Sequence, residues 1–147
     1  MPRPLTQTER EEFLAEPHIG VLSVAADDGR PPLTVPVWYA YEPGGDLTFF
    51  TGTGGRRARK IDLIDTAGTV SLCVQREQMP YRYVTVEGAV TAAARPPAPE
   101  AMRAVVERYL PEDFAKGFVE EELARPDSHL VLYTVSPQRW ITFDFAE

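Results

Sequence analysis

Hydrophobic and polar positions alternate along six short segments of the chain, and this period of two predicts β-strands. In the first segment, 18–26, both faces of the strand are largely apolar, which is typical of a strand buried in a closed sheet. Pro36, within the second segment, has no N–H to donate, so we expect that point to lie at a sheet edge or a bulge. The predicted strands span 18–26, 32–41, 47–51, 70–75, 81–94 and 130–135, the last continuing, after a bend at Ser136 and Pro137, into 140–145.

Apolar residues three or four positions apart predict helices between some of these strands. Thr6 and Glu9 match a capping box, so a helix is expected to begin near Thr6 and to end before Pro17. A short helix is predicted directly after the third strand, beginning near Ala58. A helical insertion is predicted at about 97–125. Its two helices carry apolar faces formed by Met102, Val105, Val106 and Tyr109, and by Phe114, Phe118 and Leu123.

This order of elements predicts a mainly β fold with flanking helices, built as one domain over residues 1–147. Six strands with mostly hairpin-like connections favour a six-stranded antiparallel β-barrel. A β-sandwich is the alternative, but strands that are apolar on both faces favour closure of the sheet.

Composition narrows the protein class. The chain has 147 residues, 44% hydrophobic and 25% charged, as expected of a folded globular domain. No apolar run approaches the ~20 residues of a membrane span, and the N-terminus does not resemble a signal peptide. The single Cys73 excludes an internal disulfide, and one cysteine with two distant histidines makes a metal site unexpected. We therefore expect a cytoplasmic protein that binds no metal and does not contact a membrane.

The charge distribution points to a small anionic ligand. The net charge of −7 disfavours nucleic-acid binding, which depends on widespread neutralisation of phosphates. Four of the fifteen cationic residues nevertheless fall between positions 56 and 60, namely Arg56, Arg57, Arg59 and Lys60.

The segment 51–60 combines three devices that bind phosphate. Its glycines let backbone N–H groups approach an anion, the following helix begins with free N–H donors, and its arginines match phosphate oxygens. It is neither a Walker A loop nor a Rossmann fingerprint, because Gly-Lys-Ser/Thr and a parallel βαβ unit are absent from the pattern. The alternative is a solvated basic helix start, which the helix dipole disfavours unless an anion is present.

Six stretches of the chain carry a family resemblance, namely Ile19–Ala26, Asp28-Gly29-Arg30-Pro31, Val35-Pro36-Val37-Trp38-Tyr39, Leu47–Thr51, Arg57-Ala58-Arg59-Lys60-Ile61 and Val84-Thr85-Val86-Glu87-Gly88. In this order and spacing they resemble the pyridoxamine 5′-phosphate oxidase-like split-barrel superfamily. They are most similar to the branch of flavin- and deazaflavin-dependent oxidoreductases. The resemblance implies a six-stranded split β-barrel and a homodimer with FMN or coenzyme F420 in clefts at the subunit interface. It places the cofactor phosphate at Thr51, Thr53, Arg56, Arg57 and Lys60. It places the ring system along Pro36, Val37, Trp38 and Tyr39. Tyr83, which follows Pro80 closely, is a further candidate that would approach from the partner subunit; the favoured alternative is an exposed strand start.

Two departures from the family pattern bear on the activity. Arg57 stands where the family often has Lys, and Lys60 stands where it often has Asn, so the phosphate side gains one charge. The sequence also lacks the C-terminal extension with which true pyridoxamine phosphate oxidases bind their substrate. Oxidation of vitamin B6 is therefore not expected.

No Ser-His-Asp or Cys-His set or paired-carboxylate site stands out, so no catalytic residue is assigned. This pattern fits an enzyme whose cofactor carries the hydride to or from a small unsaturated or quinone-like molecule. Two alternatives stay open: a non-catalytic protein that stores or senses a flavin, F420 or haem, and a structural dimer with an empty cleft. Haem is disfavoured, because neither His18 nor His129 is clearly placed to bind iron.

Overall fold

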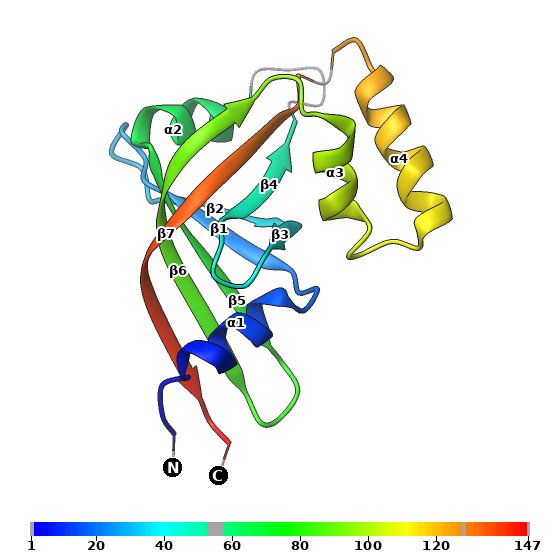
Figure 1. Cartoon of the computed structure of the whole chain (residues 1–147). Helices are drawn as coiled ribbons and strands as arrows, with labels where there is room; N and C mark the ends of the chain where they lie inside the picture. Colours follow the sequence, from blue (N-terminus) through cyan, green and yellow to red (C-terminus); the bar gives the residue numbers. More distant parts are fainter. Residues whose placement is uncertain (1, 53–57, 128, 147) are drawn as a thin grey trace.

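The computed structural model describes residues 2–52, 58–127 and 129–146. In these ranges the chain forms one antiparallel sheet and four helices (Figure 1). The strands are β1 (Gly20–Val24), β2 (Leu33–Val37), β3 (Tyr39–Tyr41), β4 (Leu47–Thr51), β5 (Thr69–Arg76), β6 (Arg82–Ala94) and β7 (Val131–Asp144). The helices are α1 (Gln7–Ala15), α2 (Arg59–Ala67), α3 (Pro99–Val106) and α4 (Glu112–Ala124).

The sheet has seven strands, so the prediction of six is wrong. The predicted second strand, 32–41, is divided at Trp38 into β2, which pairs with β1, and β3, which pairs with β4. The strand order is β2-β1-β5-β6-β7-β4-β3, so β2 and β3 form opposite edges of the sheet. At Trp38 the chain leaves one edge of the sheet and joins the other. Because one continuous strand cannot pair at both edges, the segment is divided into two strands. Pro36 lies in the edge strand β2, as predicted.

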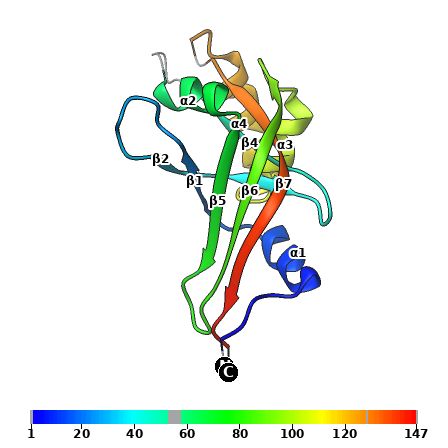
Figure 2. The same cartoon turned by 90° about the vertical axis from the view of Figure 1, so that its left-hand side faces the viewer.

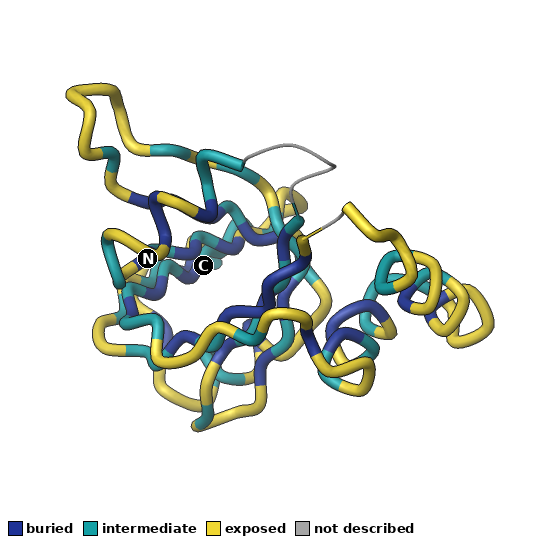
Figure 3. The backbone as a smooth tube through the Cα atoms, turned by 90° about the horizontal axis from the view of Figure 1, so that it is seen from above, coloured by how far each residue is buried: buried dark blue, intermediate teal, exposed yellow. Residues whose placement is uncertain are grey.

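Because its two edge strands follow each other through one residue, the sheet is strongly curled. Seen from above, the backbone runs round a central core, and α3 and α4 lie outside this ring (Figure 3). All seven strands belong to one sheet, which disagrees with the alternative of a two-sheet sandwich.

The core follows from the alternation of side chains along each strand. Leu22, Leu72 and Val86 face one another across β1, β5 and β6, and all three are buried. Each such side chain contributes about 1.5–3 kcal/mol when it leaves water. Phe13 and Leu14 of α1 join the same core, and Thr6 closes a capping box with Glu9 at the start of that helix, as predicted.

The predicted bend at Ser136 and Pro137 is confirmed as an irregularity between β6 and β7. The register shifts between Glu87 and Gly88, opposite Pro137, which has no N–H to donate. A Cβ atom at Gly88 would lie 2.6 Å from the carbonyl oxygen of Ser136, so only glycine allows the two strands to approach this closely.

Helices α3 and α4 form a hairpin between β6 and β7. Met102 and Val106 of α3 pack with Ala115 and Val119 of α4 in a second cluster beside the start of β7. Of the predicted apolar face of α4, Phe118 and Leu123 pack against this cluster, whereas Phe114 does not and is 71% exposed. The small Ala115 and the branched Val119 occupy the contact with α3 instead.

Arg108, just after α3, connects the helical hairpin to the rest of the fold. Its guanidinium donates to the carbonyl oxygens of Tyr39 at 2.7 Å and of Glu16 at 2.8 Å. It also donates to the Ala15 carbonyl at 3.2 Å. Because α1 has no basic residue in its last turn, Arg108 supplies both the donors and the positive charge that a helix C-terminus favours.

We expect the substitution Arg108→Ala to lower the free energy of unfolding by about 2 kcal/mol, since several charge-assisted hydrogen bonds to carbonyl groups are lost together. Urea denaturation followed by circular dichroism measures the change. Arg103→Ala is the control, because Arg103 pairs with Glu107 on the surface, and we expect a loss of about 0.5 kcal/mol or less. Equal losses in the two variants would contradict this role of Arg108.

Candidate functional site

A cavity of about 590 Å³ opens where the chain passes from β2 to β3. Its volume lies within the range of about 300–1,000 Å³ that is typical of small-molecule sites. We call it the Trp38 cleft. It is lined by Ile19, Val35, Pro36, Val37, Trp38, Phe50, Thr51, Gly52, Lys60 and Phe118.

One end of the Trp38 cleft is an aromatic wall. The Trp38 ring stacks on Tyr109, with ring centroids 5.0 Å apart and planes 8° apart. Phe118 lies on a tilt beside it at 6.0 Å. The Tyr109 hydroxyl donates to the carbonyl oxygen of His18 at 2.7 Å and accepts the N–H of Tyr39 at 3.1 Å. These bonds fix the surface on which Trp38 rests, so the wall is held before any ligand arrives.

The other end of the Trp38 cleft is cationic. Lys60, the second residue of α2, is half-buried, and burial lowers the pKa of its ammonium group. Among the residues that the structure describes, no carboxylate forms an ion pair with Lys60. The neighbouring Arg59 is turned toward the β1–β2 hairpin, where it lies 3.5 Å from Asp28. Of the two cations in α2, Lys60 is therefore the one that lines the cleft. No carboxylate among the described residues pairs with it.

Two further features make this end suited to an anion. Helix α2 begins after Ala58 without a side-chain cap, so its first backbone N–H groups and the positive end of its dipole are available to a ligand. Thr51, the last residue of β4, brings a hydroxyl to the same region of the cleft. The Trp38 cleft can thus hold a molecule with an anionic group at one end and a planar apolar body at the other.

Most of the predicted binding residues that the structure describes come together in this cleft. The lining includes Pro36, Val37, Trp38, Thr51 and Lys60. The remaining predicted phosphate-side residues, Thr53, Arg56 and Arg57, lie outside the described residues.

Tyr39 and Tyr83 do not line the cleft. Tyr39 is fully buried and donates to the carbonyl oxygen of Leu14 at 2.8 Å, and burial raises the pKa of its hydroxyl. The Tyr39 side chain is thus held within the core beside the end of α1, away from the cleft that Trp38 lines. Tyr83 stands on β6, between Gln75 and Phe143 of the adjacent strands. Its predicted approach from a partner subunit stays a prediction.

The sequence did not reveal the part that the helical hairpin plays in the site. Tyr109 and Phe118 were assigned only to apolar helix faces, yet they support and extend the Trp38 wall. Tyr109 is 70 residues from its hydrogen-bond partner Tyr39, so no local pattern connects them. A tyrosine on an otherwise aliphatic helix face was the only available signal, since a buried hydroxyl needs a partner.

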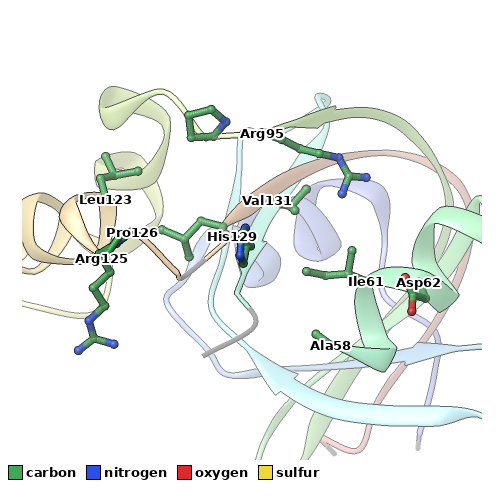
Figure 4. Close-up of a pocket in the computed structure, with 11 residues that line it drawn as sticks. Ala58, Ile61, Asp62, Arg95, Leu123, Arg125, Pro126, His129 and Val131 are labelled. Carbon is green, nitrogen blue, oxygen red and sulfur yellow. The ribbon is translucent and has the colours of Figure 1, made fainter. Parts of the chain in front are cut away.

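A second cavity, of about 500 Å³, is lined by Ala58, Ile61 and Asp62 at the start of α2 and by residues near the start of β7 (Figure 4). Arg95 and Arg125 stand on opposite sides of it. Each is paired with a carboxylate: Arg95 with Asp65 at 2.6 Å, and Arg125 with Glu122 at 3.5 Å. Because these cations already have counter-charges, the Trp38 cleft is the better candidate for an anionic ligand. Within the described part of the chain, no cluster of His, Cys, Asp and Glu is arranged to hold a metal ion, and no helix is long and apolar enough to span a membrane.

Comparison with known proteins gives a family and several structures of the same fold. A family described as "Pyridoxamine 5'-phosphate oxidase" matches residues 6–143. A comparison with curated proteins finds no significant match. Among solved structures, an F420 reductase is 25% identical, with a TM-score of 0.68, over 89% of this chain and 94% of the reductase.

Two other solved structures show the same fold at lower identity. An FAD-binding protein from Mesorhizobium loti is 20% identical, with a TM-score of 0.65, over 100% of this chain and 98% of that one. A conserved hypothetical protein from Mycobacterium tuberculosis is 22% identical, with a TM-score of 0.71, over 96% of this chain and 86% of that one. At these identities the likeness supports the fold alone.

We expect Lys60→Met to raise the free energy of unfolding of the ligand-free protein by about 0.5–1 kcal/mol, because it removes a half-buried charge and keeps the apolar stem. Chemical denaturation measures the difference. The gain should shrink as the pH rises toward 10.5, since the lowered pKa makes Lys60 neutral in the folded state before it is neutral in the unfolded state.

Lys116→Met is the control for this measurement, because Lys116 is the other lysine of the chain and is exposed on α4. We expect it to leave the free energy of unfolding within about 0.5 kcal/mol of the original value. A loss of stability in Lys60→Met would show that Lys60 is compensated within the protein.

Proposed function

Because this chain belongs to the pyridoxamine 5′-phosphate oxidase family, we propose that it is an oxidoreductase that binds FMN or coenzyme F420 in the Trp38 cleft. In this proposal hydride passes between the cofactor and a small unsaturated or quinone-like molecule. The cofactor lies on a split-barrel scaffold formed by the curled sheet, with 97–125 as a helical insertion in a single domain.

Lys60 is the observation that carries the proposal. A half-buried ammonium group without a carboxylate partner in the described chain destabilises the protein unless a ligand supplies the counter-charge. The start of α2 adds N–H donors beside it, and this is the arrangement that binds phosphate groups in many proteins. The resemblance adds Thr53, Arg56 and Arg57 to this phosphate side.

The rest of the cleft suits the ring of such a cofactor. Pro36, Val37 and Trp38 offer an apolar edge and an aromatic plane, and Tyr109 keeps Trp38 in one orientation. Phe118 lines the same space from α4. When bound, the flavin or deazaflavin ring supplies or accepts the hydride, so the protein needs to contribute position and a dry environment. The F420 reductase among the similar structures is the reason to test F420 together with FMN.

We propose in addition that two copies of the chain associate through the outer face of the sheet. Figure 2 shows β5, β6 and β7 facing the viewer, with no described helix across their middle. Val21, Cys73, Thr85 and Ile141 form one row across β1, β5, β6 and β7 on this face. Ile141 is 47% exposed. A second copy would cover this row and would bring its Tyr83 to the shared surface.

We expect Lys60→Gln to weaken the binding of FMN or F420 about 10- to 100-fold, which corresponds to the loss of one charge-assisted hydrogen bond of about 1.5–3 kcal/mol. Quenching of flavin or deazaflavin fluorescence on titration with the protein measures the Kd. Lys116→Gln removes the same charge from the surface of α4 and should change the Kd less than twofold. Failure of the unaltered protein to bind either cofactor at micromolar concentration would overturn the proposal.

Turnover separates the enzyme from the storage or sensing alternative. The reduced cofactor is mixed with the protein and a panel of quinones and activated alkenes, and its reoxidation is followed by absorbance under anaerobic conditions. Acceptor-dependent reoxidation above the rate of the free cofactor is expected of the enzyme. Tight binding with no acceleration for any acceptor would favour the non-catalytic role.

We expect Ile141→Arg to convert a dimer into monomers, because it places a charge in the middle of the proposed contact. Size-exclusion chromatography with light scattering measures the mass. Met79→Arg is the control, since Met79 is 78% exposed in the loop between β5 and β6. A monomeric unaltered protein, or a dimer that persists in Ile141→Arg, would argue against this surface.

A further inference from the structure

Helix α4 extends beyond the Trp38 cleft and carries a second apolar surface. A cavity of about 520 Å³ follows this helix. We call it the α4 groove. It is lined by Leu110, Pro111, Asp113, Phe114, Gly117, Phe118 and Glu121. Phe118 also lines the Trp38 cleft, so the groove and the cleft meet at this ring.

Aromatic side chains form the floor of the α4 groove. Phe114 and Phe118 are four residues apart and therefore lie one above the other on the helix surface. Gly117 adds no side chain to the groove, and apart from its chain neighbours and the backbone of its own helix no atom lies within 4 Å of the position that its Cβ would take. Phe114 is 71% exposed, which leaves an apolar ring in water at the mouth of the groove. Trp38 lies beside Phe118 in the adjoining cleft, with ring centroids 6.0 Å apart, so aromatic rings line both cavities.

The edges of the α4 groove are acidic. Asp113 and Glu121 both line it, and in the part of the chain that the structure describes neither carboxylate forms an ion pair. The whole of α4 carries five acidic residues, Glu112, Asp113, Glu120, Glu121 and Glu122, against the single Lys116. The groove is thus opposite in sign to the Lys60 end of the cleft.

We propose that the α4 groove is the entry and binding surface for the hydride acceptor, and that it admits planar, apolar, uncharged molecules while disfavouring anionic ones. The inference rests on the proposed function and extends it to the acceptor. Phe114 and Phe118 supply the surface for a flat ring, and the carboxylates of Asp113 and Glu121 repel an approaching anion. The anionic cofactor is separated from this repulsion because its phosphate lies at Lys60, at the other end of the Trp38 cleft.

In the proposed reaction, a quinone would accept one hydride from the reduced cofactor and one proton from water. It leaves as the hydroquinone while the cofactor becomes oxidised, so two electrons and both hydrogens are accounted for.

The first experiment measures binding directly and needs no turnover. The chain has two tryptophans, Trp38 and Trp140, so Trp140→Phe leaves Trp38 as the only tryptophan reporter. Quenching of Trp38 fluorescence gives the Kd of an uncharged naphthoquinone and of its sulfonated analogue, with and without saturating cofactor. We expect the uncharged quinone to bind at least fivefold more tightly than the sulfonate at low ionic strength. We also expect this preference to decrease in 0.5 M salt, as electrostatic repulsion is screened.

Charge substitutions then locate the source of the selectivity. Asp113→Asn with Glu121→Gln should tighten binding of the sulfonate about three- to tenfold and leave the uncharged quinone unchanged. Glu112→Gln with Glu120→Gln is the matched control, because both residues are exposed on α4 and lie outside the groove lining. It removes the same net charge and should change either Kd less than twofold. Equal effects of the two double variants would overturn the role of the groove edges.

Phe114 provides a test that spares the fold, because its side chain is already exposed. Phe114→Ser should raise the Kd and the KM of the uncharged quinone about fivefold and leave the cofactor Kd unchanged. An unchanged quinone KM together with normal cofactor binding would overturn this inference and leave the proposed function intact. Failure of the unaltered protein to bind cofactor would overturn the proposed function, while the fluorescence titration would still decide whether the groove binds the quinone. A change of oligomeric mass in Phe114→Ser, with no quinone binding, would show instead that a second copy covers the groove.

Discussion

The structure depends on one constraint, which is that the chain passes between the two edges of the sheet at Trp38. Strand β2 ends its pairing with β1, and β3 begins its pairing with β4 one residue later, although these strands are at opposite ends of the sheet order. Backbone groups at such a crossing need other partners. Tyr109 and Arg108, from the end of α3, bond the N–H and the carbonyl of Tyr39. The helical hairpin therefore stabilises the crossing, and the candidate site lies where the hairpin and the crossing meet.

This arrangement explains why Lys60 can be kept half-buried at a cost in stability. The sheet core, with side chains such as Leu22 and Val86, provides the bulk of the folding free energy, and Lys60 is not part of it. A cation without a counter-charge in the described chain can then be tolerated near the start of α2. In an acidic protein, the same cation gives an anionic ligand one clearly favoured position.

The sequence predicted the strands well and the crossing poorly, for a physical reason. Alternation reports which face of a strand is buried, and Val35, Val37, Tyr39 and Tyr41 continue the same alternation through Trp38. The pattern therefore cannot show that the strand changes partner, and one strand was predicted where there are two. The placement of Lys60 at a helix start was easier to predict, because the two adjoin in sequence. The support from Tyr109 and Phe118 depends on contacts across the fold, which no local spacing encodes.

The division between sheet and insertion separates two kinds of specificity. The groups proposed to hold the cofactor stand on or beside β2, β4 and α2, whose positions are tied to the sheet core. The groups proposed to hold the acceptor stand on α4, which packs against the sheet chiefly through α3. A change in α4 can therefore alter the surface that an acceptor meets without moving Lys60 or the start of α2. Because Phe118 lines both cavities, the two ligands of the proposed reaction would meet at this ring.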